Sequence, residues 1–527
     1  MIRRLRLAYP LLVAAYPTLW IASFNPGEFH STDLLIVLCA VLILGGAVYA
    51  GVALVLRKHY SPEIIAAIAA LVNGWFFLYL PASESLMLLL SVRIRHWYVV
   101  PFLAVPTLVL LGWMLFRRPK LESATTFLAL MFFALVLQAA ARDVYAESRA
   151  LATIRRTSIA QKLADPIPRH HDGDGPNVRR DIYLLVFDMY ANSQVLRDYL
   201  HFDNTPFEDS LRNLGFSVPS SALTNYSQTS LSLPSILNFE YVNEIKREDE
   251  RSRLGENLSN YLVENNRTVR FLKEQGYLYV MFPSSWWKST KRSPHADYTF
   301  FGWDTGILRQ LSHTAFRRQV VNMTLLRWLG LSSPRGDGRH IARTFTAIAD
   351  VANRPEPTFT FAHFMTPHRP FIVDANCGDL PESSGFRYTH ESPEGARLYL
   401  AQLQCVNRRL LPLVRTLLAR SDPAPIILIQ GDHGTRTVNP TRGNPGDTIT
   451  AAEVRERLGA FGAYYLPAGG GDALGDSVTA VNLMRFVLSY YAGADLPPLP
   501  DSLFYSLNKQ VMKFFPVTVN GGRVPPT

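Results

Sequence analysis

Five long apolar runs at the start of the chain constrain its fold more than any other feature of the sequence. They lie at about residues 7–24, 32–56, 62–80, 98–116 and 123–141. A helix needs about 20 apolar residues to cross about 30 Å of hydrocarbon, and each run meets or approaches that length. A secretory signal peptide would be a single short run followed by a cleavage site. We therefore expect residues 1–145 to form an α-helical membrane domain with about five spans.

Clusters of Lys and Arg predict the orientation of these spans. "MIRRLRL" precedes the first run, "RKHY" follows the second and "RRPK" follows the fourth. With five spans, all three lie on one side, which should be the cytoplasm, and they outweigh "RIRH" on the other side. Everything after residue 145 is then expected outside the cytoplasmic membrane. The net charge of +10 is spread along the chain without a basic motif, so no nucleic-acid partner is expected.

Residues 146–178 read as a junction between the membrane domain and the rest of the chain. "ESRALATIRRTSIAQKLA" has the pattern of a basic amphipathic helix that lies on the membrane surface. "DPIPRHHDGDGPN" then reads as a flexible linker of turn-forming residues. Its His170, His171, Asp172 and Asp174 have no scaffold to hold them, so we expect a solvated linker and no metal site.

From residue 179 onward, strand patterns alternate with helix patterns. Short apolar runs typical of buried strands stand at 181–187, 277–282, 358–364 and 426–430. Helical patterns cover 257–276 and 396–420, and Pro412 is expected to kink or split the second of these. The alternation predicts that 179–527 form an α/β domain with a mainly parallel sheet covered by helices on both faces. Ligands of such sheets lie beyond the carboxyl ends of the strands.

Acidic and imidazole side chains follow three of the predicted strands. Asp188 ends the first strand, His363 and His368 lie at the third, and Asp432 and His433 follow the last. Carboxylate oxygens and imidazole nitrogens suit zinc or manganese. Taken singly, each residue also has a structural interpretation: the aspartates as helix caps, His363 as a core histidine and His368 as part of an ordinary turn. Their coincidence at strand ends of one sheet favours a metal site.

The stretch "NYSQTSLSLPSILNFEY", residues 225–241, supplies candidate nucleophiles just before a helical pattern. A hydroxyl at a helix N-terminus faces unpaired backbone N–H groups and the positive end of the helix dipole, which favours anionic oxygens. The alternative is an N-cap followed by a serine-rich first turn. Elsewhere, Cys39 sits in a span, whereas Cys377 and Cys405 lie in the exported part. They are expected to form a disulfide there, with two free buried thiols as the alternative.

These motifs resemble the alkaline phosphatase/sulfatase superfamily, and more narrowly its membrane-anchored lipid A phosphoethanolamine transferases and lipoteichoic acid synthases. The resemblance covers the whole layout and is strongest at residues 181–190, 225–238, 359–371 and 426–434. It implies that 179–527 are a sulfatase-like catalytic domain that uses a divalent metal, zinc or manganese. It also implies a multi-pass protein of the bacterial inner membrane with its catalytic domain in the periplasm.

Site residues follow from the resemblance position by position. It implies that Asp188, Thr229, Asp432 and His433 hold the metal. Thr229 is the implied nucleophile, because "TSLSLP" matches the transferase pattern of a threonine five residues before a proline. His368 matches a histidine that binds the substrate, and His363 matches its upstream companion. We expect His368 also to protonate the leaving oxygen.

The sequence also departs from these families. Sulfatases mature a Cys or Ser of "CxPSR" to formylglycine; Ser232 occupies that place, but Ile236 replaces the arginine, which leaves Ser232 as a reserve nucleophile. After "DHG", the stretch "TRTVNPTRGNPGD" replaces an acidic stretch and a further histidine, which puts a second metal in doubt. Arg436 and Arg442 would suit an anionic substrate group, although loop arginines are more often simply solvated.

The expected function is transfer of a phospho-substituent, of the phosphoethanolamine or phosphoglycerol type, through a phospho-threonine intermediate. The donor would be a membrane phospholipid and the acceptor a cell-envelope glycan or glycolipid. The alternative is a membrane-tethered phosphatase, phosphodiesterase or sulfatase that uses the same site with water as acceptor. A non-enzymatic envelope protein ranks last, because it would be expected to lack the metal ligands.

Overall fold

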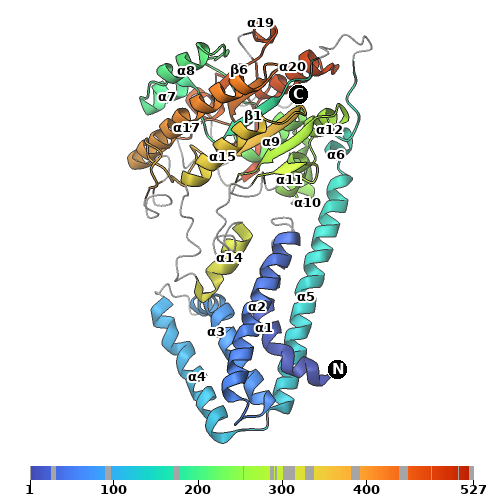
Figure 1. Cartoon of the computed structure of the whole chain (residues 1–527), viewed down its shortest axis with the longest axis vertical. Coiled ribbons are helices and arrows are strands. Elements are labelled where there is room, and N and C mark those ends of the chain that lie inside the picture. Colours follow the sequence, from blue (N-terminus) through green and yellow to red (C-terminus); the bar gives the residue numbers. More distant parts are fainter. Residues whose placement is uncertain are drawn as a thin grey trace. The chain divides into compact units, whose positions relative to one another are not determined.

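The computed structural model describes residues 2–24, 31–89, 96–169, 178–252, 254–284, 290, 293–300, 315–326, 338–380, 388, 392–437, 449–475, 478–507 and 510–520. The chain forms two compact units. One comprises Met1–Ala152 and Asp304–Ser333, and the other comprises Thr153–Trp303 and Pro334–Thr527. The first unit holds the long apolar helices and the second holds the main sheet (Figure 1).

The first unit contains five long helices. They are α1 (Ile2–Phe24), α2 (Ser31–Leu56), α3 (Pro62–Leu89), α4 (His96–Arg117) and α5 (Glu122–Arg155). Among the described residues, each of these helices is long and apolar enough to cross a membrane, which confirms the predicted number of spans. The fully buried Asn73 of α3 donates to the carbonyl oxygens of Pro10 in α1, at 2.9 Å, and of Gly45 in α2, at 3.4 Å. Interhelical hydrogen bonds of this kind hold helices together where lipid removes the hydrophobic driving force.

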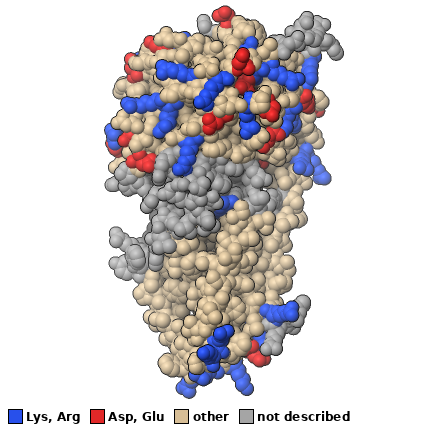
Figure 2. All heavy atoms as spheres, in the orientation of Figure 1, with Lys and Arg blue, Asp and Glu red and all other residues tan. Residues whose placement is uncertain are grey.

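Charged side chains are distributed unevenly over the first unit. The visible face of its helices is almost free of charge, with Lys and Arg gathered at one end (Figure 2). Arg57 and Lys58 after α2, and Arg117, Arg118 and Lys120 at the end of α4, are exposed. These are the basic clusters that predict the cytoplasmic side, and the structure exposes them where the spans end.

A segment far along the chain also belongs to the first unit. Helix α14 (Ala315–Met323) packs Val320 and Met323 into an apolar cluster formed by α1, α2 and α3. The expected boundaries, with all of 179–527 in one domain, therefore differ from the structure, since 304–333 return to the membrane unit. The sequence did not indicate this insertion because a nine-residue amphipathic helix lacks the long apolar run that marks a span.

The expected surface helix at the junction is not present as one element. Its first part extends α5 to Arg155, and its second part is the short helix α6 (Ser158–Lys162). Ile159 is fully buried in an apolar cluster of the second unit. The apolar face that indicated a membrane-surface helix therefore packs against protein. The tract with His170, His171, Asp172 and Asp174 lies outside the described residues.

The main sheet has six strands in the order β3-β2-β4-β1-β5-β6. They are β1 (Ile182–Phe187), β2 (Leu278–Phe282), β3 (Tyr298–Thr299), β4 (Thr358–Phe364), β5 (Ile426–Gly431) and β6 (Gly462–Tyr465). Every pairing is parallel except that of β5 with β6, which confirms the predicted mainly parallel sheet. All residues of the central strand β1 are buried, as expected for a strand covered on both faces.

Helices cover both faces of this sheet (Figure 1). One apolar layer joins it to α7 (Ser193–Leu200), α8 (Thr205–Arg212), α15 (Gly338–Val351) and α17 (Pro393–Arg420). The other joins it to α9 (Thr229–Asn238), α12 (Arg267–Glu274) and α20 (Ala480–Ala492). Pro412 does not split α17, which runs unbroken past it.

The helix expected at 257–276 is divided into α11 (Gly255–Glu264) and α12. Asn266 causes the break, because its side-chain oxygen accepts a hydrogen bond from the Val269 N–H at 2.9 Å and so caps the second helix. Gly276 follows the end of α12 with a φ of 84°, a left-handed conformation that glycine adopts without strain.

The remaining described elements are α10 (Glu244–Ser252), α18 (Ala451–Leu458), α19 (Gly470–Leu474) and the hairpin β7 (Leu503–Leu507) and β8 (Gln510–Val517). The hairpin contacts the segment that leads into α9 and holds it in place. The Phe504 backbone donates to the Asn225 carbonyl at 2.8 Å and accepts from the Ser227 N–H at 3.2 Å. The rings of Phe504 and Tyr226 stack at 5.0 Å. The β7–β8 hairpin thus fixes the backbone segment that precedes Thr229.

Cys377 and Cys405 form a disulfide that joins α17 to the segment after β4 and closes a loop with a sequence separation of 28 residues. Closure of a loop of this length restricts the unfolded chain, so Cys405→Ser should lower the free energy of unfolding by about 3 kcal/mol. Chemical denaturation under oxidising conditions measures this. Cys39→Ser is the matched control, because Cys39 is free. An equal loss in both variants, or none in Cys405→Ser, would contradict the prediction.

Candidate active site

Three neighbouring strands place the predicted ligands at one edge of the sheet. Phe187, the last residue of β1, lies in register with Phe364 of β4 and with Gly431 of β5. Asp188 follows β1 directly, and its N–H donates to the Phe364 carbonyl at 2.8 Å. The side chains at 188, 363 and 432 therefore meet at the carboxyl ends of adjacent parallel strands, where ligands of such sheets bind.

The two glycines that flank Asp432 and His433 are required by close backbone contacts. A Cβ at Gly431 would lie 2.2 Å from the Tyr190 carbonyl oxygen, and a Cβ at Gly434 would lie 2.1 Å from that of Glu456. Any larger residue would push the turn after β5 away from α18 and from the turn after β1. The glycines of "GDHG" thus allow the turn that carries Asp432 and His433 to pack closely against its neighbours.

A strained residue fixes the direction of Asp188. Met189 has a φ of 61°, which is uncommon for a residue other than glycine. Its N–H donates to Asp432 Oδ1 at 3.0 Å, and its carbonyl accepts from the Tyr399 hydroxyl at 2.7 Å. Asp432 Oδ1 also accepts the His433 N–H at 2.8 Å. One oxygen of Asp432 thus ties the turns after β1 and β5 together, and strain of this kind is typical of functional sites.

Side-chain atoms of three buried residues near these turns form a candidate metal site. Asp188, His363 and Asp432, all buried, offer ligand atoms that lie within 4.8 Å of one another. Asp188 Oδ1, His363 Nε2 and Asp432 Oδ2 are buried and have no hydrogen-bond partner. Buried polar groups are rarely left unpaired, and two carboxylates with an imidazole suit zinc or manganese. The residues present therefore fit a divalent cation.

Thr229 and His433 complete this cluster. Thr229 is the first residue of α9, and its Oγ1 lies 3.2 Å from His433 Nε2 and 3.5 Å from Asp188 Oδ2. His433 Nε2 lies 3.4 Å from Asp432 Oδ2. His433 Nδ1 lies 3.0 Å from the Gly434 carbonyl, which leaves the Nε2 lone pair facing the carboxylates. The four residues that the resemblance implies as metal ligands are therefore brought together.

Burial changes the protonation of these side chains. Desolvation raises the pKa of Asp188 to about 7 and that of Asp432 to about 8, the second also because of the Asp188 charge. Desolvation also lowers the pKa of His363 to about 3 and that of His433 well below its usual value. The cluster therefore binds protons at its carboxylates and keeps its imidazoles neutral until a cation takes up the charge.

These pKa shifts predict how the stability of metal-free protein depends on pH. Above about pH 7.5 the histidines are almost entirely neutral in both folded and unfolded states, and unfolded aspartates are already ionised. Between about pH 7.5 and 8.5 the folded Asp432 and the remaining protonated Asp188 still lose protons, so the free energy of unfolding should fall as pH rises. Thermal melting in chelator at both pH values tests this. A melting temperature that stays constant, or falls equally when Mn²⁺ is added, would contradict it.

The structure places the other predicted residues in different surroundings. His363 lies within the candidate metal group, rather than beside it as a substrate ligand, and its Nδ1 lies 2.9 Å from Thr290 Oγ1. The half-buried His368 lies beside the cluster, because its N–H donates to the Asp188 carbonyl at 3.2 Å. Ser232 points elsewhere; its hydroxyl donates to the Tyr226 carbonyl at 2.8 Å.

Two loop arginines were also considered on the basis of sequence. Arg436 is half-buried and lies on the segment that follows His433. Arg442 lies outside the described residues. The sequence did not single out Arg457, whose buried guanidinium lies 3.3 Å from His433 Nε2. Arg457 is one of two arginines in the polar helix "AAEVRERL" and belongs to no motif, so the sequence held no signal for it.

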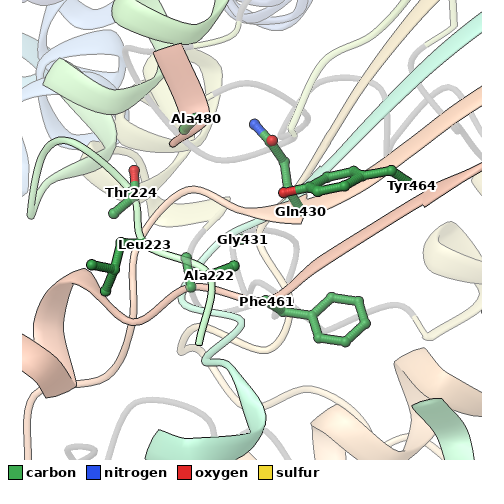
Figure 3. A pocket seen from close by; sticks show the side chains of 9 residues that line it. Ala222, Leu223, Thr224, Gln430, Gly431, Phe461, Tyr464 and Ala480 are labelled. Carbon is green, nitrogen blue, oxygen red and sulfur yellow. The ribbon is translucent and has the colours of Figure 1, made fainter. Parts of the chain in front are cut away.

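A small pocket lies close to this site without being part of it (Figure 3). Thr224, Gln430 and Tyr464 line it from the α9 approach, from β5 and from β6. None of the three candidate metal ligands lines it. Gln430 and the ligand Asp432 are separated by Gly431 alone, so the pocket lies behind the turn that carries the site.

Comparisons with known proteins identify a family for this chain. The family model described as Sulfatase matches residues 191–485, which is more than half of the chain and includes Thr229, His363, Asp432 and His433. No curated protein matches the sequence.

Three solved structures illustrate the similarity of fold. The C-terminal periplasmic domain of EcEptC from Escherichia coli, in complex with Zn, is 15% identical over 63% of this chain and 87% of that chain, with a TM-score of 0.42. The lipoteichoic acid synthase LtaP from Listeria monocytogenes is 10% identical over 70% and 93%, with a TM-score of 0.40. The putative sulfatase yidJ from Bacteroides fragilis is 14% identical over 60% and 75%, with a TM-score of 0.37.

Proposed function

We propose that this chain, which belongs to the sulfatase family, is a membrane-anchored transferase that moves a phospho-substituent from a phospholipid to a cell-envelope glycan or lipid. One observation carries the proposal. A threonine hydroxyl at a helix N-terminus lies 3.2 Å from His433 Nε2 and 3.5 Å from Asp188 Oδ2, beside buried atoms that fit a divalent cation. The same chain carries five helices long enough to cross a membrane.

Thr229 acts as the nucleophile in this proposal. Its Oγ1 forms a bond to phosphorus, and the bond from phosphorus to the diacylglycerol oxygen breaks. The Thr229 proton passes to solvent, and His368 passes a proton that it takes from solvent to the leaving oxygen, so that it ends the step neutral as it began. A hydroxyl of the acceptor then attacks the phospho-threonine, and the proton of that hydroxyl returns to Thr229 Oγ1. Donor and acceptor thus exchange the phospho-substituent without net consumption of water.

Asp188, His363, Asp432 and His433 would hold the divalent cation, zinc or manganese, with Thr229 Oγ1 next to it. A bound cation lowers the pKa of a neighbouring hydroxyl and offsets charge on a phosphoryl oxygen. The N-terminus of α9 adds backbone N–H groups and a positive dipole end at Thr229. The family match and the strand-end geometry support this arrangement, and the spans account for a lipid donor and a lipid leaving group.

Mass spectrometry of the full-length protein tests the intermediate. The protein is incubated with total membrane lipid and digested, and the peptide that carries Thr229 is measured. We expect an added mass equal to one phospho-substituent, which also identifies the head group. If that peptide stays unmodified while labelled lipid is consumed, the phospho-threonine intermediate is excluded.

The second candidate function is hydrolysis by the same site, as a membrane-tethered phosphatase, phosphodiesterase or sulfatase. The match to a family described as Sulfatase favours it, since water can take the place of the acceptor. A fluorescent phospholipid supplied with and without cell-envelope glycan separates the two. Transfer predicts a labelled product only when glycan is present, whereas hydrolysis predicts release of a free head group in both cases.

A further inference from the structure

Arg457 joins the two segments that carry the reacting groups. It lies in α18, and its side chain is almost fully buried. Its Nε donates to the Ser227 carbonyl at 2.7 Å, and its Nη1 donates to the Gly434 carbonyl at 2.8 Å. Ser227 stands two residues before Thr229, and Gly434 directly follows His433. Two of the three guanidinium nitrogens are therefore held by backbone that leads to the site.

The third nitrogen lies within the site. Nη2 is 3.3 Å from His433 Nε2 and 3.4 Å from Gln228 Oε1. His433 Nε2 is itself 3.2 Å from Thr229 Oγ1. Because the guanidinium is planar and rigid, fixing Nε and Nη1 also fixes the position of Nη2 beside His433 Nε2, the atom that Thr229 Oγ1 contacts. This nitrogen carries two N–H donors, and its contacts with His433 Nε2 and Gln228 Oε1 are both long for hydrogen bonds.

The charges around Arg457 indicate what Nη2 binds. The carboxylates of Asp188 and Asp432 are the acidic groups of the cluster, and a divalent cation would offset both of their charges. Among the described residues no other carboxylate is paired with Arg457, so its buried positive charge then lacks a counter-charge, which is costly in a packed interior. A substrate ester with an anionic oxygen would supply that counter-charge and accept a charge-assisted hydrogen bond.

We propose that Arg457 binds an anionic oxygen of the tetrahedral ester group through Nη2, while Nε and Nη1 hold the guanidinium beside His433. The inference rests on the proposed function only in that the substrate is a phosphate or sulfate ester. It assigns Arg457 to substrate binding and adds a fixed donor on the side of the site formed by α18. Inorganic phosphate and sulfate share the chemistry that Nη2 recognises, and both serve as probes.

Arg457→Gln tests the inference, with Arg485→Gln as matched control. Arg485 is also buried, and it also donates from Nε and Nη1 to two carbonyls, those of Pro497 at 2.7 Å and Phe239 at 3.0 Å. Full-length protein in detergent with Mn²⁺ is titrated with inorganic phosphate, and in a second arm with sulfate, by calorimetry. We expect the dissociation constant for the preferred anion to rise about 10- to 100-fold in Arg457→Gln, the cost of one charged hydrogen bond. Arg485→Gln should bind as wild type does.

Arg457→Lys keeps the charge but cannot donate to both carbonyls and to the anion, so it should bind the anion about 10-fold more weakly than wild type. It decides the question if Arg457→Gln does not fold. Wild-type affinity in Arg457→Lys or Arg457→Gln, or an equal loss in Arg485→Gln, would overturn the inference and leave the proposed function intact. A wild-type protein that binds neither anion would overturn both.

Discussion

Thr229→Ala should abolish transfer and leave the fold and metal binding intact. Loss of the only hydroxyl within reach of His433 among the described contacts removes the attacking atom, so kcat should fall by about 10³-fold or more. Asp188, His363, Asp432 and His433 remain, and the bond that Oγ1 donates to Asp188 Oδ2 is long, at 3.5 Å, so its loss should change their positions little. The measurement is turnover of a fluorescent phospholipid, with metal content determined on the same samples.

Two variants serve as controls for that result. Thr229→Ser keeps a hydroxyl at the first position of α9 and should retain part of the activity. Ser232→Ala removes the reserve nucleophile, whose hydroxyl donates to the Tyr226 carbonyl, and should cost about 1 kcal/mol of stability with turnover preserved. Undiminished transfer by Thr229→Ala would refute its assignment, and loss of turnover in Ser232→Ala alone would move the nucleophile to that position.

The parts of this fold that the sequence predicted depend on local patterns. Long apolar runs indicated the five spans, and alternation of apolar strands with helical patterns indicated the parallel sheet. The strand-end rule then brought Asp188 and Asp432 to one edge, because β1 and β5 are direct neighbours. Each of these inferences uses residues close together in sequence, together with a rule that holds for the whole class of fold.

The parts that were missed depend on contacts that no local pattern records. His363 was expected beside the substrate, and the register of β4 with β1 instead turns its Nε2 toward the carboxylates. Arg457 enters the site only because the tightly packed turn at Gly434 lies against the end of α18. The packing of helix α14 against α2 and α3 was also missed. It depends on a few apolar residues, such as Val320, and any amphipathic helix carries residues of this type.

Asp432→Asn should remove metal binding while preserving the turn after β5. Oδ1 of Asp432 accepts the N–H groups of Met189 and His433, and an asparagine oxygen can accept both. Oδ2, the buried atom that faces the cluster, becomes an amide nitrogen that donates hydrogen bonds and cannot ligate a cation. Loss of a direct metal ligand lowers metal affinity more than loss of a group that only hydrogen-bonds to a ligand. The metal affinity should therefore fall more than about 100-fold.

Without metal, Asp432→Asn should be at least as stable as wild type, although it binds metal more weakly. At pH 8 the buried carboxyl of Asp432 loses its proton near the Asp188 charge, and asparagine removes that repulsion. The variant should therefore melt at or above the temperature of chelator-treated wild type, and added Mn²⁺ should stabilise only wild type. Asp181→Asn is the matched control, because its Oδ1 also accepts two bonds, both from Thr358, at the other end of β1. Wild-type metal affinity in Asp432→Asn would exclude the Asp432 carboxylate as a ligand.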